Sequence, residues 1–267
     1  MEHLHDAAAL RESMRARDPV VGGWVSIGHP AVAEITAGAA LDFVTIDMEH
    51  AAMSIETVEN LVRAVSVTPG ETVPLVRPPS ADPVAIKRVL DTGAGGLLVP
   101  RVDTPAEAAQ VVEASTYPPA GMRGTGGGRA SNYGGTLPAY IDAADEALTR
   151  IIQVETRDAV DNAAEIAAVD GVDALFVGPA DLSAALDCHL DFSASQFEDA
   201  VESVLDAAEA EGVPVGVFAT APDQLEAWLD SGFDFAIVGY DAKFLREATD
   251  ELVAAFDEGT GDPSEAR

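Results

Sequence analysis

The sequence predicts an α/β protein built as a (β/α)8 barrel, the TIM-barrel architecture. Short runs of β-branched and apolar residues alternate along the chain with longer segments whose apolar residues recur at helical spacing. The chain has 267 residues, and one such barrel typically takes about 250. Ionisable or glycine-framed residues follow several of the apolar runs. This pattern is expected where the carboxyl ends of parallel strands converge on a site.

Eight segments have the length and composition of buried strands. They are residues 23–27, 43–46, 73–76, 96–99, 150–154, 174–177, 213–218 and 235–238. Valine, isoleucine, phenylalanine and leucine dominate them, and Gly, Pro, Asp or Ser lies near most of their ends. Their number is the one that a closed eight-stranded barrel requires.

Helical periodicity fills most of the stretches between these strands. The expected helices are residues 55–67, 83–92, 105–115, 158–168, 194–211, 222–231 and 241–256. Ser54 and Asp82 are typical N-caps, and Thr104 with Glu107 forms a capping-box pattern. With no linker in the sequence, we expect one barrel domain over residues 1–256 and a flexible acidic tail over residues 257–267.

The charge balance is strongly acidic, with 46 Asp and Glu residues against 15 Lys and Arg and a formal net charge of −31. Such a surface repels nucleic acid and anionic membranes, so neither is an expected partner. Lysine occurs only as Lys87 and Lys243. This composition favours a halophilic protein whose self-repulsion is screened by salt; an acidic protein from ordinary salt is the alternative.

Cysteine and hydropathy patterns point to a cytoplasmic protein. Cys188 is the only cysteine, so no internal disulfide can form. No apolar run approaches the roughly 20 residues that a membrane-spanning helix needs.

One connection, residues 117–129, is rich in glycine and proline and longer than a routine link. Its two arginines, Arg123 and Arg129, could hold a phosphate or a carboxylate in a glycine frame. A plain flexible loop is the alternative. The chain contains no GxxxxGK[ST] motif, so no nucleotide-binding P-loop is expected.

Two carboxylates follow neighbouring predicted strands, Glu155 after residues 150–154 and Asp181 after residues 174–177. They could share one hard divalent cation, Mg²⁺ or Mn²⁺, and leave coordination positions for water and a bidentate oxygen substrate. The alternative is structural, with Glu155 as a solvated helix cap and Asp181 as the N-cap of a short helix.

Arg77 and His50 follow two other predicted strands. Prolines flank the Arg77 segment and stiffen it, so its guanidinium could bind a carboxylate or a developing enolate oxygen. An ion pair across the barrel rim is the alternative. Asp47 and Glu49 flank His50 and could tune its imidazole as a general base, whereas a lone histidine could equally be packed or solvated.

Six segments carry a resemblance to a known family, and they occur in order between Gly22 and Phe256. They are residues 46–51 (IDMEHA), 74–78 (PLVRP), 87–94 (KRVLDTGA), 117–124 (YPPAGMRG), 153–155 (QVE) and 177–183 (VGPADLS). Together they resemble the signatures of the HpcH/HpaI family of metal-dependent class II pyruvate aldolases. The resemblance implies a barrel of the phosphoenolpyruvate/pyruvate-binding type and aldol cleavage of a 4-hydroxy-2-oxo acid into pyruvate and an aldehyde.

The resemblance also implies roles for individual residues. Glu155 and Asp181 would bind the divalent metal, Mg²⁺ or Mn²⁺ with Co²⁺ as a further option, and Arg77 would stabilise the pyruvate enolate. His50 would be the base, paired with Asp91 of a neighbouring subunit. Substrate-binding positions would be Arg77, Gln153, Gly178, Pro179 and Asp181, and supporting positions Asp47 and Glu49. The family commonly forms hexamers, as trimers of dimers that exchange the last helix, so a homo-oligomer is expected.

Two departures from the family pattern concern the aldehyde half of the substrate. The segment 126–128 is richer in glycine than usual, and His29 replaces a smaller polar residue at the exit of the first strand. Both could face the aldehyde. Alternative functions are a CoA-ester lyase or an oxaloacetate decarboxylase on the same metal–enolate scaffold, or a non-catalytic paralogue.

Overall fold

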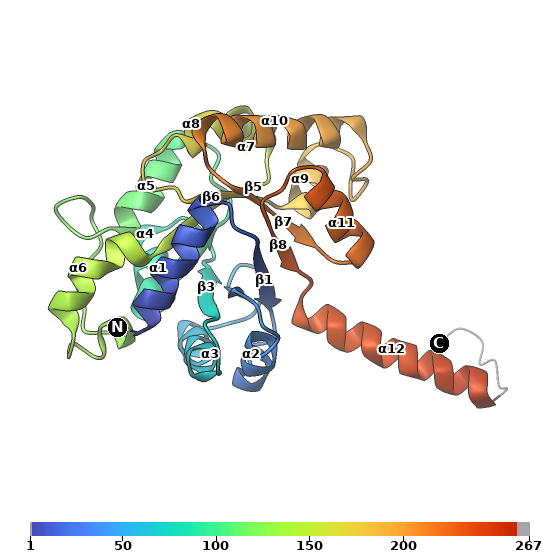
Figure 1. The fold of residues 1–267 in the computed structure, drawn as a ribbon, viewed down its shortest axis with the longest axis horizontal. Coiled ribbons are helices and arrows are strands. Elements are labelled where there is room, and N and C mark those ends of the chain that lie inside the picture. The colour runs from blue at the N-terminus through green and yellow to red at the C-terminus, as the bar shows by residue number, and fades with distance from the viewer. Residues whose placement is uncertain (1, 261–267) are drawn as a thin grey trace.

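The computed structural model describes residues 2–260 and forms a closed barrel of eight parallel strands in chain order (Figure 1). The strands are β1 (Val20–Val25), β2 (Phe43–Asp47), β3 (Val73–Arg77), β4 (Gly96–Val99), β5 (Thr149–Val154), β6 (Ala174–Val177), β7 (Val215–Ala219) and β8 (Phe235–Val238). The predicted (β/α)8 architecture is therefore confirmed. Strand limits differ from the prediction by up to three residues.

Helices surround the barrel in the alternating order that the sequence predicts. They are α1 (Glu2–Arg15), α2 (Pro30–Ala37), α3 (Ile55–Val67), α4 (Pro83–Asp91), α5 (Pro105–Ser115), α6 (Leu137–Ala147), α7 (Arg157–Asp161), α8 (Ala163–Ala167), α9 (Pro179–Ala185), α10 (Ser195–Glu211), α11 (Pro222–Asp230) and α12 (Asp241–Thr260). The expected helix over residues 158–168 is divided at Asn162, whose backbone leaves helical geometry between α7 and α8.

Local capping explains where several helices begin. The Ser54 hydroxyl accepts a hydrogen bond from the Thr57 amide, and the Asp82 carboxylate accepts two from the first turn of α4. Thr104 and Glu107 form the complete capping box of α5. These contacts satisfy amides that would otherwise lack partners at helix starts.

The barrel interior is filled by side chains, and α1 covers its amino-terminal end. Ala7, Leu10 and Met14 of α1 belong to the same buried cluster as inward residues of the strands, such as Phe43 and Leu98. Burying this face of α1 shields the floor of the barrel from water. The open end is therefore the one where the strands finish.

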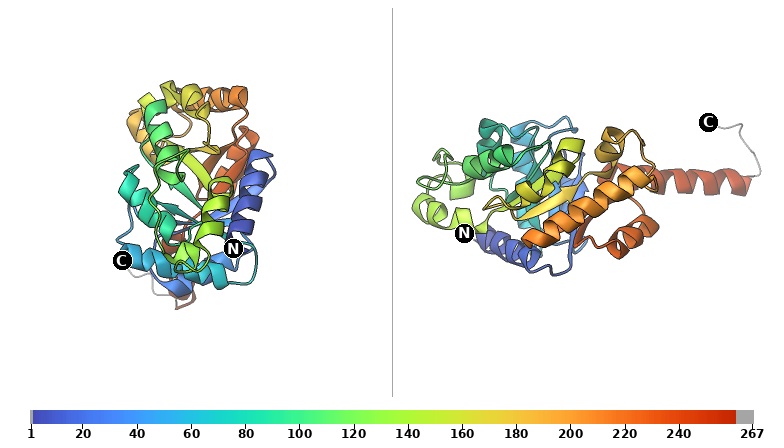
Figure 2. Two further views of the ribbon diagram at one scale, coloured as in Figure 1. Left: turned by 90° about the vertical axis from the view of Figure 1, so that its left-hand side faces the viewer. Right: turned by 90° about the horizontal axis from the view of Figure 1, so that it is seen from above.

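The last helix, α12, extends away from the barrel instead of packing against it (Figures 1 and 2). The segment 257–267 was expected to be a flexible tail, but residues 257–260 continue α12, and residues 261–267 lie outside the described part of the chain. Within residues 2–260, no helix is both long and apolar enough to cross a membrane.

Candidate active site

Most of the predicted site residues meet at the carboxyl ends of β2, β3, β5 and β6. Asp47 and Arg77 are the last residues of β2 and β3, and the two positions are paired in register. A cavity of about 820 Å³ opens at this end of the barrel. Its lining includes Asp47, His50, Arg77, Gln153, Gly178, Pro179 and Asp181.

The Arg77 guanidinium is buried and held from three sides. Its Nε donates to Asp47 Oδ1 at 2.8 Å, and its Nη1 lies 2.9 Å from Glu49 Oε2. Its central carbon lies 4.5 Å from the centroid of the Trp24 ring, within cation–π range. Asp47 also accepts the Glu49 amide, which fixes the turn after β2. The guanidinium is therefore preorganised to face negative charge in the cavity.

Glu49 links Arg77 to His50. Burial raises the pKa of Glu49, and the neighbouring Arg77 charge opposes that rise. Glu49 Oε2 lies 3.8 Å from His50 Nε2, and the His50 side chain is 67% exposed. The imidazole therefore reaches solvent on one side and a carboxylate on the other, an arrangement that suits proton transfer.

Glu155 is a buried carboxylate directly after β5. Its Oε1 accepts the Arg101 amide at 2.9 Å, and its Oε2 accepts a hydrogen bond from Gln153 Nε2. Burial, together with the charges of Glu49 and Asp181, raises the pKa of Glu155 to about 7. A cluster of carboxylates that repel one another in this way favours the binding of a cation among them.

Gly178 makes room for this arrangement. A Cβ at that position would lie 2.7 Å from Gln153 Nε2 and 3.5 Å from Glu155 Oε2. Pro179 then begins α9, and Asp181 lies exposed in its first turn. The segment therefore brings backbone close to Gln153 while presenting a carboxylate to the cavity.

The predicted metal ligands are oxygen donors of the kind that a hard cation prefers. Among residues 2–260, no group of three or more His, Cys, Asp or Glu side chains is arranged to hold a metal ion. Glu155 and Asp181 supply two carboxylates, and the buried Gln153 Oε1 is an acceptor without a hydrogen-bond partner. Two carboxylates with water and substrate oxygens suffice for Mg²⁺ or Mn²⁺, so these residues fit the metal.

Asp91 does not lie in this cavity. It ends α4, where its Oδ1 accepts a hydrogen bond from Arg123 Nη2 at 3.3 Å. The Arg123 guanidinium contacts the rings of Tyr117 and Tyr140, at 4.6 and 5.4 Å from their centroids. Burial raises the pKa of Asp91, and the Arg123 charge opposes the rise. The pairing of Asp91 with a histidine of another subunit stays a prediction.

Three sequence-based interpretations are not supported by the geometry. The Arg123 side chain has no exposed surface and pairs with Asp91, and Arg129 donates to the Thr92 carbonyl, so both arginines fasten their loop to the end of α4 and do not face a ligand in the cavity. His29 caps α2 by accepting the Ala31 amide, and does not line the cavity. Gly128 packs against Asp91 and also lies outside the cavity lining.

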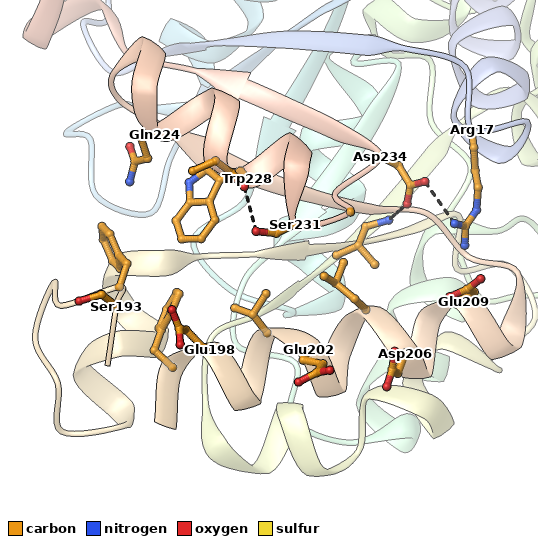
Figure 3. Close-up of a pocket in the computed structure, with 17 residues that line it drawn as sticks. Arg17, Ser193, Glu198, Glu202, Asp206, Glu209, Gln224, Trp228, Ser231 and Asp234 are labelled. Carbon is orange, nitrogen blue, oxygen red and sulfur yellow. Dashed lines mark hydrogen bonds and ion pairs between the residues drawn. The ribbon is translucent and has the colours of Figure 1, made fainter. Parts of the chain in front are cut away.

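A second hollow, of about 710 Å³, lies between α10 and α11 (Figure 3). Acidic residues of α10 line its outer side, and Trp228 of α11 faces them. Gln224 belongs to the lining of both hollows. The arginine–carboxylate pair of this second hollow, Arg17 with Asp234, precedes β1 and β8 and so lies at the amino ends of the strands. The cavity at the carboxyl ends of the strands is therefore the candidate active site.

Sequence reasoning missed two contributors to this cavity. Arg101 adopts a left-handed backbone conformation with φ of 53°, which directs its amide toward Glu155. Such a conformation is uncommon for a residue other than glycine, so the presence of an arginine at position 101 gives no reason to predict it. The ring of Trp24 in β1 packs against the Arg77 guanidinium. The only sequence feature that could have indicated this contact is a large aromatic residue close to the end of a strand.

Buried carboxylates and a fixed arginine at the carboxyl ends of the strands define a (β/α)8-barrel enzyme with its site at the usual end of the fold. The model of the HpcH/HpaI aldolase/citrate lyase family matches residues 21–248. The chain belongs to this family, as its sequence motifs predict.

Several relatives resemble this chain over most of its length. It is 43% identical over 250 residues to a 4-hydroxy-2-oxovalerate aldolase of Novosphingobium aromaticivorans, covering 92% of each chain. It is 36% identical to a 4-hydroxy-2-oxo-heptane-1,7-dioate aldolase of Salmonella typhimurium, covering 93% of this chain and 94% of the relative. A solved HpcH/HpaI aldolase/citrate lyase family protein from Burkholderia cenocepacia superimposes with a TM-score of 0.89 at 35% identity, covering 93% and 98% of the two chains.

Proposed function

We propose that this protein is a divalent-metal-dependent class II aldolase that cleaves a 4-hydroxy-2-oxo acid into pyruvate and an aldehyde. One observation carries the proposal. Asp181 and the preorganised Arg77 guanidinium line the same cavity at the carboxyl ends of the strands. Glu155 lies beside it, where the charge of Asp181 helps to raise the pKa of the Glu155 carboxyl group. The aldolase names of the relatives support the same reaction class.

Cleavage of the carbon–carbon bond leaves an enolate, so the site must stabilise developing negative charge. A divalent cation held by Glu155 and Asp181 would supply Lewis acidity at the keto and carboxylate oxygens. Arg77 donates hydrogen bonds to the developing enolate oxygen, and Asp47 and Glu49 keep it in place. Gln153, Gly178 and Pro179 shape the pyruvate end of the cavity.

His50 is the residue placed to move a proton. Aldol cleavage needs a base that takes the proton of the 4-hydroxyl group, and an imidazole at the cavity rim can pass that proton to solvent. A Schiff-base mechanism needs a lysine at the site. The two lysines, Lys87 in α4 and Lys243 in α12, lie outside the cavity lining.

The test is pyruvate release from 4-hydroxy-2-oxo acids, followed by a coupled dehydrogenase assay in concentrated salt with Mg²⁺, Mn²⁺ or Co²⁺. Chelation should abolish turnover, and added metal should restore it. Asp181→Asn should lower kcat/KM by about 100-fold or more, whereas Asp223→Asn, an exposed control on α11, should leave it unchanged. Full activity in chelator would exclude the metal mechanism. Metal binding without pyruvate release would direct the test to oxaloacetate and acyl-CoA esters.

We further propose that the working unit is a homo-oligomer, and specifically a hexamer built as a trimer of dimers. The projecting helix α12 exposes a set of large apolar side chains, and such a face is stable in water only when it is covered. They are Phe244, Leu245, Leu252, Val253 and Phe256. In this assembly Asp91 would pair with His50 of a neighbouring subunit. Light scattering should give six times the chain mass, and Leu252→Asp with Phe256→Asp should reduce it.

The setting that we propose is the cytoplasm of a salt-adapted cell. With a net charge of −31, repulsion between carboxylates destabilises the folded chain at low ionic strength, and concentrated salt screens this repulsion. Activity that rises with KCl and disappears in dilute buffer would support this setting.

A further inference from the structure

The cavity at the strand ends has two chemically different halves. The ends of β2, β3, β5 and β6 contribute the ionisable half described above. The other half comes from the ends of β7, β8 and β1 and from the segment between α9 and α10. Ser26, Thr220, Gln224 and Ala242 line this half together with six larger, mainly apolar residues, Trp24, Ile27, Leu190, Phe192, Phe218 and Tyr240. We call these six residues the apolar wall.

Aromatic packing fixes the apolar wall in place. Trp24 and Phe218 meet edge to face with ring centroids 5.5 Å apart, and Phe218 lies 6.3 Å from Tyr240. Phe192 packs against Trp228, at 5.8 Å, in the hollow behind it. Figure 3 shows Trp228 on α11 facing α10. Rings packed in this way form a preorganised apolar surface. Because their side chains are already ordered, ligand binding costs little additional side-chain entropy.

The Ser26 and Thr220 hydroxyls beside the apolar wall already have partners within the protein. The Ser26 hydroxyl donates to Asp241, which also accepts the Ser26 and Ile27 amides. The Thr220 hydroxyl donates to Gln224 Oε1 at 3.1 Å. A polar ligand would have to compete with these bonds, whereas an apolar ligand leaves them intact.

Among the residues that one chain contributes to this cavity, none supplies a spare cation. Arg77 is the only Arg or Lys among the described residues that line the cavity, and Asp47 and Glu49 already bind it. His50 lies on the β2 side, beside Glu49. A second carboxylate carried into the apolar half would lose its water without gaining a partner, in a protein of net charge −31.

We propose that the aldehyde that this enzyme releases or accepts is neutral and apolar, with an alkyl or aryl group seated on the apolar wall. This specificity rests on the proposed aldolase function. In the condensation direction, C3 of the pyruvate enolate bonds to the aldehyde carbonyl carbon. The proton lost from the pyruvate methyl group is balanced by the proton that the new 4-hydroxyl oxygen takes up.

The test compares three aldehydes of four carbons that differ in charge and in polar groups: butanal, succinic semialdehyde and erythrose. Condensation with pyruvate is measured in high salt with Mn²⁺. We expect kcat/KM for butanal to exceed that for each of the other two by about tenfold or more. From propanal to pentanal, each added methylene should raise kcat/KM by up to about fourfold. Equal rates, or a preference for either polar aldehyde, would overturn the proposal.

Exchange of the pyruvate methyl protons in deuterated water separates this proposal from the aldolase function itself. Exchange needs enolate formation but no aldehyde, and it is followed by proton NMR. Without metal-dependent exchange the aldolase function fails. Exchange combined with a preference for succinic semialdehyde or erythrose leaves the aldolase function standing and removes the apolar specificity.

A substitution in the apolar wall tests its location. Leu190 is 66% exposed, and its amide, not its side chain, donates to Ser183. Leu190→Arg adds a cation at the rim, and Leu190→Gln is the matched neutral control. With each rate normalised to the variant's own exchange rate, Leu190→Arg should lower the butanal preference over succinic semialdehyde at least about fivefold relative to Leu190→Gln. The same preference in both variants would mean that the aldehyde does not lie against this wall.

Discussion

Replacing Glu155 by glutamine should stabilise the metal-free protein at pH 8. Glu155 is 3% exposed, and the pKa of its carboxyl group, about 7, lies well above the ordinary value of 4.5. The folded chain therefore binds this proton more tightly than the unfolded chain does. The resulting stability is fully present below about pH 4.5 and is lost as the pH rises through about 7.

The size of the effect follows from the same two values. Each pKa unit corresponds to about 1.4 kcal/mol, so full ionisation would cost about 3 kcal/mol. Water entry and small movements of the side chains reduce this figure, and we expect a gain of about 2 kcal/mol for the glutamine variant at pH 8. For a chain of this size the gain corresponds to a melting point about 4–8 °C higher.

Local hydrogen bonding supports the direction of this change. A glutamine Oε1 at position 155 can still accept the Arg101 amide. Its Nε2 can donate to Gln153 Oε1, the buried acceptor that lacks a partner, once the Gln153 amide turns over. The variant therefore removes a charge without increasing the number of unpaired atoms, because Gln153 Nε2 takes the place of Gln153 Oε1 as the atom without a partner.

Melting curves at pH 5 and pH 8, in chelator and at fixed high salt, measure this prediction. Glu226→Gln is the control, because Glu226 is an exposed glutamate on α11 and the change removes the same charge from the surface. Added Mn²⁺ should raise the melting point of the wild type but not that of Glu155→Gln. The reasoning fails if the variant is no more stable than the wild type at pH 8, or if its advantage is the same at both pH values.

Three further outcomes are expected. Gly178→Ala should weaken Mn²⁺ binding by about tenfold in calorimetry, because the new Cβ displaces Gln153, whereas Gly259→Ala, with open space around it, should not. Arg123→Met should lower the free energy of unfolding by roughly 3 kcal/mol in urea, because it leaves the half-buried Asp91 without its cation; an unchanged midpoint would contradict this. The melting point should rise between 0.1 and 2 M KCl, and a flat profile would exclude the proposed salt adaptation.

The barrel was predictable because its signals are local. Each strand is a short apolar run, and several helices begin at a cap that the sequence displays, such as Ser54, Asp82 and Thr104. Four helices are absent from the expected set, α1, α2, α6 and α9. The apolar positions of α1 are spaced as Leu4, Ala7, Leu10 and Met14, but charged residues between them obscure the stripe. α6 lies inside a segment whose glycines favoured a loop.

The ionisable half of the cavity was also visible in the sequence, because every member lies at the end of a strand or just after it, and strand ends converge. The apolar wall was not. Its residues come from β1, β7, β8 and a loop between helices, and nothing in the local sequence relates Trp24 to Phe218 or Leu190. The position of Asp91 relative to His50 depends on a second subunit, which no pattern within one chain can place.

The two halves of the cavity together account for the chemistry and for its cost to stability. Glu49, Glu155 and Asp181 repel one another when ionised, which destabilises the metal-free barrel and at the same time favours the arrival of a cation. The apolar wall borders the other side, and exclusion of water there would strengthen the interactions that we propose between Arg77 and charge that develops on the substrate. A carboxylate on the aldehyde would undo both effects, because it would add to the repulsion and bring water with it. The specificity that we infer and the instability that we predict for the metal-free protein therefore have the same electrostatic origin.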